Sequence, residues 1–394
     1  MSNNKHYIPY AKQNITRDDM EAVQQALTQS VITRGPLVEA FENEIAAYCG
    51  SRYAVAFHTA TAGLMAAYYA ADVGVDDRIV TTPNSFIATI GGGIQLGATP
   101  VFVDIDRNTG NLNLDQTILN SNHSHSKGKT LVVPVHFSGI PVDIQALDAS
   151  FNDYRTVIIE DAAHAIGSSY SDGSKVGSCA WSHMTVFSFH PAKTMTTGEG
   201  GIVTTNDPEL WHLLKLYRAN GIEKDPSFMS HEEYPGYYEV QFLSGNHHMT
   251  EMQAALGLSQ LRRLDQFIKK RKDLMQLYRN KLASARYLRL FSPAENLSVS
   301  YHLCVVQIDF AAYNTTRKAV MEELHSMGIG TQVHYIPLYR HPFFTKGAGD
   351  ISLYFPEMEK YYSQALSLPL YFDLNEEDVD RVVFSLKTAL LKRR

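Results

Sequence analysis

Cysteine is scarce in this sequence, and basic residues are not in excess. The 394 residues include three cysteines, which stand far apart at Cys49, Cys179 and Cys304. An odd number of widely spaced cysteines argues against a disulfide framework and is typical of a reducing compartment, so we expect a cytoplasmic protein. The formal net charge of −6 leaves no basic footprint for nucleic acid, so no nucleic-acid partner is expected.

The sequence also lacks a clear targeting or membrane segment. The first residues, "MSNNKHYIPY", have no apolar stretch of the kind found in signal peptides. Residues 79–103 carry no charge, but proline, asparagine, glutamine and glycine residues interrupt this run. A buried strand–helix–strand unit explains the run better than a membrane span does, so we expect no membrane partner.

Two further kinds of site have little support. No G-x-G-x-x-G motif follows an expected strand, which argues against a dinucleotide-binding oxidoreductase. His123, His125, His247 and His248 lie in polar loops without carboxylates at ligand spacing. We therefore expect no metal site.

Short apolar segments alternate with helical patterns in the first part of the chain. Thr16 and Asp19 have capping-box spacing, so a helix begins there. Further helices are expected at 60–71 and 85–96, and strands at 52–57, 78–82, 99–105, 130–137 and 156–161. This alternation predicts an α/β fold with a mostly parallel central sheet, covered on both faces.

The pattern changes near residue 246. Thr250 and Gln253 form another capping box, and one long amphipathic helix is expected to follow, with Met252, Leu256, Leu264, Ile268 and Met275 on one face. A strand at 303–310 and a last helix at about 376–391 come later. We expect a large domain at 1–245 and a smaller α+β domain at 246–394.

Ligands of open parallel sheets bind at the carboxyl ends of the strands, so the residues just after each strand are informative. Thr59, Ala60 and Thr61 follow the strand that ends near Phe57 and open a helix. The free N–H groups of a helix start, with a hydroxyl beside them, suit a phosphate. Simple helix capping by Thr59 is the alternative.

A pair of carboxylates ends the strand at 156–161. Asp161 follows apolar strand residues, and Glu160 stands beside it. A carboxylate near a core needs a charged or hydrogen-bonded partner, so Asp161 is either a functional acid or a structural cap or ion pair. His164 could support Asp161 or a ligand, or could be a core histidine with satisfied ring nitrogens.

Lys193 follows the apolar segment "MTVFSFHPA", and a second strand is expected to begin at Ile202. A lysine at that position would be desolvated, and the pKa of a catalytic lysine falls to roughly 7–8 in this way. Its neutral amine would then attack an aldehyde. A surface lysine in a loop is the alternative.

A phosphate seat, a buried acid and an aldehyde-reactive lysine together match the needs of pyridoxal 5'-phosphate. The lysine would bind the aldehyde as a Schiff base, and Asp161 would keep the pyridine nitrogen protonated. Phe86, after the second strand, offers an aromatic ring to cover the cofactor. Ser188 could add a hydrogen bond to the phosphate.

Three motifs, "IIEDAAHAIG", "FSFHPAKTMTTGEGG" and "SGNHHMTEMQAALG", resemble in order and spacing those of the DegT/DnrJ/EryC1/StrS family of sugar aminotransferases. The resemblance extends over nearly the whole chain. It implies the fold type I aminotransferase architecture and a homodimer whose active sites lie at the subunit interface. Lys193 argues against the dehydratases of this family, in which histidine replaces the lysine.

The resemblance assigns further roles to single residues. The Schiff-base lysine falls on Lys193, and the pyridinium partner on Asp161. The other cofactor contacts fall on Ala60, Thr61, Phe86, His164, Ser188 and, from the partner subunit, Asn246. His248 stands where the family usually has arginine or lysine, so this chain lacks the family's fixed cation at that position.

The segments "IPYAKQNIT" and "GIGTQVHYIPLYRHPFF" most resemble the pseudaminic acid branch of the family. This branch aminates C4 of UDP-2-acetamido-2,6-dideoxy-β-L-arabino-hex-4-ulose, with L-glutamate as donor. His334 and Tyr335 would contact the sugar, although a role as core residues is an equal alternative, and His248 is a further candidate substrate contact. A different nucleotide-linked 4-keto or 3-keto deoxysugar, other pyridoxal phosphate chemistry and a cofactor-binding regulator are the other readings, but no DNA-binding segment supports the regulator.

Overall fold

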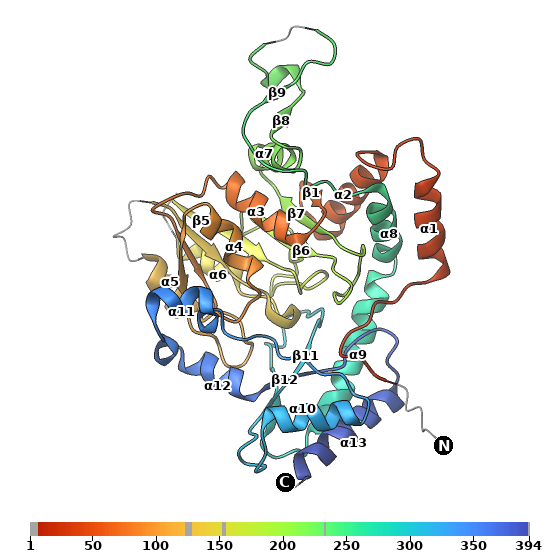
Figure 1. Ribbon diagram of the computed structural model, residues 1–394, viewed down its shortest axis with the longest axis vertical. Coiled ribbons are helices and arrows are strands. Elements are labelled where there is room, and N and C mark those ends of the chain that lie inside the picture. The colour runs from red at the N-terminus through yellow and green to blue at the C-terminus, as the bar shows by residue number, and fades with distance from the viewer. Residues whose placement is uncertain (1–6, 123–127, 152–154, 232–233, 393–394) are drawn as a thin grey trace.

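The protein is described from a computed structural model that covers residues 7–122, 128–151, 155–231 and 234–392. Its centre is a sheet of seven strands in the order β1-β7-β6-β5-β4-β2-β3 (Figure 1). The strands are β1 (Tyr53–Phe57), β2 (Arg78–Thr81), β3 (Thr99–Phe102), β4 (Thr130–Val133), β5 (Thr156–Asp161), β6 (Met184–Ser188) and β7 (Gly201–Thr205). Only β7 runs antiparallel to its neighbours in this sheet. The expected mostly parallel α/β sheet is therefore confirmed.

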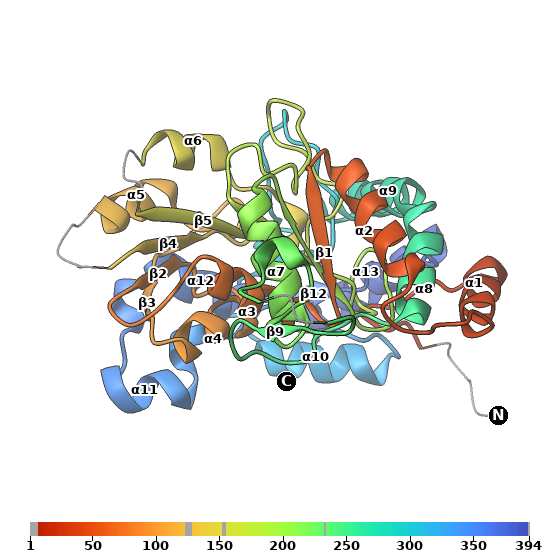
Figure 2. The same cartoon turned by 90° about the horizontal axis from the view of Figure 1, so that it is seen from above.

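Helices cover both faces of this sheet (Figure 2). Successive residues of β1 alternate between the two faces, as the pleat of a strand requires. Ala54 and Ala56 pack toward α2 (Pro36–Cys49), α5 (Leu114–Asn122) and α6 (Ile144–Ala149). Val55 and Phe57 pack toward the opposite layer, which consists of α3 (Ala60–Ala70), α4 (Ala88–Gln95) and α7 (Pro208–Arg218).

The uncharged run at 79–103 forms β2, α4 and β3, as expected from its interruptions. Gly92 and Gly93 let α4 approach its neighbours closely, because a Cβ on Gly93 would lie 2.2 Å from the Ile79 side chain. Within the described residues, no helix is both long and apolar enough to span a membrane.

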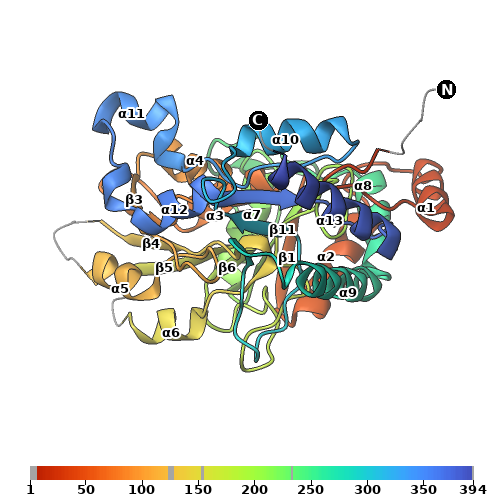
Figure 3. The ribbon, with the colours of Figure 1, turned by 90° about the horizontal axis from the view of Figure 1, so that it is seen from below.

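A second, antiparallel sheet lies in the C-terminal part, with the strand order β10 (Leu288–Leu290), β11 (Cys304–Ile308) and β12 (Ala365–Leu368). Helices α10 (Arg317–Ser326) and α13 (Glu376–Leu391) cover it and share a core with the second half of α9 (Leu264–Leu282), as Figure 3 shows. Helices α11 (Pro342–Ala348) and α12 (Pro356–Gln364) belong to the segment of chain that joins β11 to β12. The last helix has the bounds that the sequence predicted.

The prediction of a single long helix after Thr250 is wrong. The chain forms α8 (Glu251–Leu261) and α9 (Leu264–Leu282), and Arg263 leaves the helical conformation between them. Its guanidinium pairs with Asp19 of α1 (Arg17–Leu27) at 2.6 Å, which fixes the break. Since α8 and the start of α9 pack into the core of the large sheet, the domain boundary at 245 stays a proposal.

A narrow arm extends from the body between α7 and α8 (Figure 1). It contains β8 (Ile222–Glu223) and β9 (Glu239–Val240), which pair as an antiparallel ribbon. Five of its large apolar side chains are exposed: Phe228, Tyr234, Tyr238, Val240 and Leu243, the last of which is 90% exposed.

Candidate functional site

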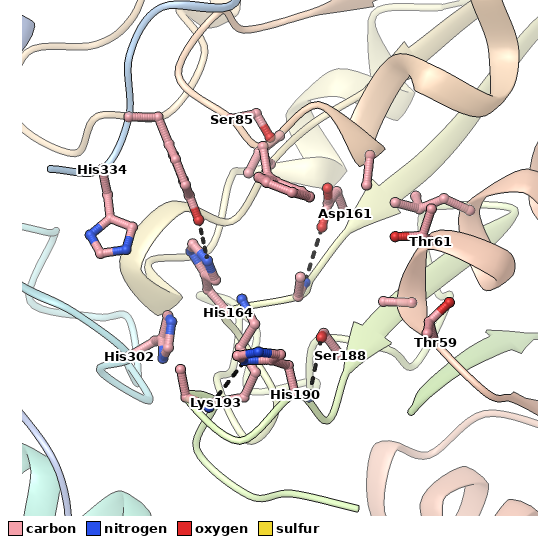
Figure 4. A pocket seen from close by; sticks show the side chains of 18 of the residues that line it. Thr59, Thr61, Ser85, Asp161, His164, Ser188, His190, Lys193, His302 and His334 are labelled. Carbon is pink, nitrogen blue, oxygen red and sulfur yellow. Dashed lines mark hydrogen bonds between the residues drawn. The ribbon is translucent and has the colours of Figure 1, made fainter. Parts of the chain in front are cut away.

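A cavity of about 460 Å³ opens at the carboxyl ends of the large sheet's parallel strands (Figure 4). The turns after β1, β2, β5 and β6 line it from the large sheet. The rest of its lining includes residues from outside the large sheet, namely Tyr10 near the N-terminus and His302, His334 and Tyr335 from the C-terminal part of the chain. The cavity therefore brings together Ala60, Thr61, Phe86, Asp161, His164, Ser188 and Lys193, seven residues that the sequence placed at the cofactor.

Lys193 lies in the loop that joins β6 to the antiparallel β7. The backbone N–H of Lys193 donates to the carbonyl of His190 at 2.8 Å, which turns the chain back toward the sheet. Burial lowers the pKa of the Lys193 amine to about 8, although the nearby Asp161 carboxylate acts to raise it. A lysine with this pKa has a substantial neutral fraction near pH 7–8 and can act as a nucleophile or as a base.

Asp161 ends β5 and is 6% exposed. Its Oδ2 accepts a hydrogen bond from the Thr89 hydroxyl at 2.6 Å, and its Oδ1 accepts one from the Ala163 N–H at 3.1 Å. Glu160 points to the opposite face of the sheet, where it meets His136 at 2.6 Å and Thr185 at 2.7 Å. The pleat thus separates the two neighbouring carboxylates, and only Asp161 reaches the cavity.

The start of α3 forms the far end of the cavity. The Thr59 hydroxyl caps the helix by accepting from the Ala62 N–H at 3.1 Å, so the capping role that the sequence left open is present. Ala60 and Thr61 follow in the first turn, where backbone N–H groups have no partner within the helix. A Cβ on Gly201 would lie 2.4 Å from the Ala60 nitrogen, so glycine is required where β7 passes this turn.

Two aromatic side chains face the cavity from different sides. Phe86 precedes α4 and is 59% exposed, so its ring is free to cover a flat ligand. His164 is buried, and its Nδ1 accepts from the Ser138 N–H at 3.3 Å. Its Nε2 therefore carries the proton and donates to the Tyr335 hydroxyl at 3.2 Å. Burial, and next the charge of Lys193, hold the pKa of His164 well below its usual range.

His334 and Tyr335 both line the cavity, as expected for substrate contacts. Each also has a partner inside the protein, since the Nδ1 of His334 lies 2.8 Å from the Ser367 hydroxyl. Burial lowers the pKa of His334 to about 3, with the charge of Lys193 adding to the effect, so this imidazole is neutral. The core role and the ligand role are therefore compatible for both residues.

Asn246 and His248 lie outside this cavity. Their segment runs beside the end of β1, where the His58 N–H donates to the His247 carbonyl at 3.0 Å. Asn246 is exposed there. Burial lowers the pKa of His248 to about 4, with further contributions from Arg218 and Arg34, so His248 does not supply a positive charge. The contact of Asn246 with a cofactor in a partner subunit stays a prediction.

The sequence prediction missed several residues of the cavity. Ser85 lines the cavity, whereas Thr89 does not line it but bonds Asp161 through its hydroxyl; only their closeness to Phe86 in the sequence could have pointed to them. His302 is 5% exposed, and its Nδ1 has no hydrogen-bond partner among the described residues. Tyr10, His190 and Glu199 also line the cavity. His190 and Glu199 flank Lys193 within the motif at 187–201, and Tyr10 lies in the segment "IPYAKQNIT", so these quoted segments could have pointed to them; His302 lies in none of the quoted motifs.

The groups in the cavity fit pyridoxal phosphate. The first turn of α3 and Ser188 offer donors to a phosphate, Asp161 offers an anion to a pyridinium N–H, and Lys193 offers an amine to the aldehyde. Among the residues that the structure describes, no cluster of histidine, cysteine and carboxylate side chains could hold a metal ion. His123 and His125 lie outside the described residues.

Comparison with known proteins places these features in context. A model described as the DegT/DnrJ/EryC1/StrS aminotransferase family matches residues 13–387. The spore coat polysaccharide biosynthesis protein SpsC of Bacillus subtilis is 35% identical over 97% of this chain and 97% of its own. The Campylobacter jejuni protein named UDP-4-amino-4,6-dideoxy-N-acetyl-beta-L-altrosamine transaminase is 33% identical over 98% of each chain.

A solved structure agrees over the same length. Helicobacter pylori PseC, described as an aminotransferase involved in the biosynthesis of pseudoaminic acid, superposes with a TM-score of 0.88 at 29% identity. The match covers 98% of this chain and 99% of that chain.

Proposed function

The chain belongs to the DegT/DnrJ/EryC1/StrS family and is a pyridoxal phosphate-dependent sugar aminotransferase of fold type I, and from this premise we propose its substrate. The proposed reaction moves the amino group of L-glutamate to C4 of UDP-2-acetamido-2,6-dideoxy-β-L-arabino-hex-4-ulose, in pseudaminic acid biosynthesis. The printed names of the Campylobacter and Helicobacter relatives support this choice.

A second cavity is the observation that supports a large, extended substrate. It has a volume of about 670 Å³ and shares Ser85, Phe86, His334 and Tyr335 with the first, so the two cavities adjoin. Its remaining lining is mostly apolar and comes from α4, α11 and the segment between β11 and β12. We place the sugar over the cofactor beside His334 and Tyr335, with the nucleotide extending past Phe86.

The chemistry needs an electron sink and an amino carrier, and bound pyridoxal phosphate supplies both. We assign Lys193 to bind its aldehyde and, once released, to take the proton from Cα of glutamate and later to give a proton to C4 of the sugar. The pKa of about 8 suits both directions of this transfer. Asp161 holds the pyridine proton, while Ala60, Thr61 and Ser188 bind the phosphate.

We further propose a homodimer with shared sites. Within the described residues, Lys193 is the only lysine or arginine that lines either cavity, yet the substrates carry carboxylates and a diphosphate. Cations from another chain would balance these charges. The exposed Asn246 and the apolar side chains of the arm at 222–245 offer a surface for that chain.

Another nucleotide-linked keto sugar is the second candidate, since the Bacillus relative takes part in spore coat polysaccharide biosynthesis and is slightly more similar. The test is to incubate the holoenzyme and L-glutamate with a panel of UDP- and dTDP-linked 4-keto and 3-keto deoxysugars and to detect amino sugars by mass spectrometry. Selective conversion of the L-arabino UDP-sugar supports the proposal. Preferential conversion of any other panel member contradicts it and leaves the aminotransferase assignment in place.

A further inference from the structure

The carboxylate of Asp161 is held from beneath by a short chain of hydroxyl groups. Among the described residues, Thr89 is the only side chain that hydrogen-bonds this carboxylate. Thr89 is fully buried, and its hydroxyl also contacts the hydroxyl of Ser85. The hydroxyl of Tyr68 bonds the Thr89 carbonyl from the other side, which fixes this turn of the backbone.

The direction of these bonds follows from the acceptor at the end. An ionised carboxylate can only accept, so the Thr89 hydroxyl donates its proton to Asp161. The oxygen of Thr89 is then free to accept from Ser85. The chain therefore runs from Ser85 to Thr89 to Asp161, and every proton in it points toward the carboxylate.

Such an arrangement has two physical effects on Asp161. A donor to a carboxylate stabilises its charged form, which is the form that a pyridinium partner requires. Two fixed donors, Thr89 on Oδ2 and the Ala163 N–H on Oδ1, also leave the carboxylate one orientation, with its remaining lone pairs toward the cavity. Support of this kind from beneath sets how precisely a site holds its ligand.

We propose that Thr89, supported by Ser85, is a positioning residue that holds the Asp161 carboxylate aimed at the pyridine nitrogen. The inference rests on the role proposed above for Asp161. It also explains the geometry of the turn at 85–89, which places Phe86 in the cavity to cover the cofactor and Thr89 beneath the carboxylate. One turn of chain thus carries Phe86, which would cover the ring, and Thr89, which supports the carboxylate that would face it.

The test uses Thr89→Val, which keeps the shape and removes the donor, and Thr89→Ser, which restores a hydroxyl. A hydrogen bond to a charged group corresponds to roughly 10- to 100-fold in an equilibrium constant. We expect Thr89→Val to weaken pyridoxal phosphate binding by about that factor and to shift the pH midpoint of the bound cofactor's visible band. Thr89→Ser should restore most of the affinity, and Ser85→Ala should cost roughly 2- to 10-fold.

Thr81→Val is the matched control. Thr81 is equally buried, and its hydroxyl donates to the Val133 carbonyl at 2.6 Å without touching Asp161. This variant should lose stability by thermal melting but keep the affinity for pyridoxal phosphate. Equal loss of affinity in Thr81→Val and Thr89→Val would show that any buried hydroxyl gives the effect, and would overturn the inference.

A double-mutant cycle separates positioning from packing. In an Asp161→Ala background, Thr89→Val should no longer change cofactor affinity, since its acceptor is gone. A persisting effect, or an unchanged affinity of Thr89→Val in the wild-type background, overturns the inference. If Asp161→Asn alone binds cofactor and reacts with glutamate as the wild type does, the proposed role of Asp161 fails first, so the two failures are distinguishable.

Discussion

Replacing Lys193 by methionine should stabilise the cofactor-free protein at neutral pH while abolishing turnover and the visible band of the bound cofactor. Burial lowers the pKa of this lysine from 10.5 to about 8, so the charged amine is disfavoured in the folded chain. At about 1.4 kcal/mol per pKa unit, that difference corresponds to about 3 kcal/mol of folding free energy. Methionine fills a similar volume without a charge, so it should recover up to that amount.

The pH dependence gives the sign of the effect. Below about pH 8, the lysine is protonated in both the folded and the unfolded chain, and the full penalty is present. Between pH 8 and 10.5, the folded chain has already released the proton while the unfolded chain still binds it. The wild type's free energy of unfolding should then rise relative to the variant by about 1.4 kcal/mol per pH unit.

Urea unfolding of the two cofactor-free proteins from pH 6.5 to 10.5 measures this difference. The variant's advantage should be largest near pH 7 and should vanish near pH 10.5. The difference between the two proteins removes the contributions of tyrosines and cysteines that titrate in the same range. An advantage that is absent at pH 7, or constant across the range, would refute a desolvated Lys193. A fully active Lys193→Ala enzyme would refute its catalytic role.

Three other results are expected. Asp161→Asn should bind cofactor more weakly and slow the half-reaction with glutamate by several powers of ten, each of which corresponds to about 1.4 kcal/mol of barrier. Stopped-flow absorbance measures this rate, and an unchanged rate would leave Asp161 a structural cap. Mixed subunits of Lys193→Ala and Asn246→Ala should be more active than either parent after exchange, and a fully active monomer at high dilution would exclude shared sites. The enzyme should have a much larger kcat/KM for the L-arabino sugar than for its C5 epimer, the D-xylo sugar, because the epimer leaves polar groups such as those of His334 and Tyr335 unpaired. Equal kcat/KM values for the two sugars would point to another branch of the family.

Local signals predicted much of the fold. The capping boxes at Thr16 and Thr250 both begin helices, and the last helix spans Glu376–Leu391, as predicted. These signals work because they depend on neighbours three residues apart. The break before α9 could not be predicted in this way, since it depends on an ion pair between Arg263 and Asp19, which lie far apart in the sequence.

The residues of the site were likewise predictable only where a local signal marks them. Lys193 and Asp161 lie at or just after the carboxyl ends of strands, where ligands of parallel sheets bind, so their positions could be predicted. Thr89 lies on α4 and His302 beside the second sheet, and neither follows a strand of the large sheet. Their places depend on how helices and domains pack, which residue type and spacing alone do not encode.

The position of β1 in the sheet has a consequence for the order in which the chain is made. Its ladder partner is β7, whose residues 201–205 leave the ribosome long after residues 53–57. At about 5–20 residues per second, the interval is roughly 7 to 30 s. During that time, β1 is an unpaired apolar strand, which other chains can pair with. In a nascent chain that stops before residue 201, β1 therefore has no strand to pair with. Helix α3, which follows β1, cannot yet form one end of the cofactor cavity in such a chain.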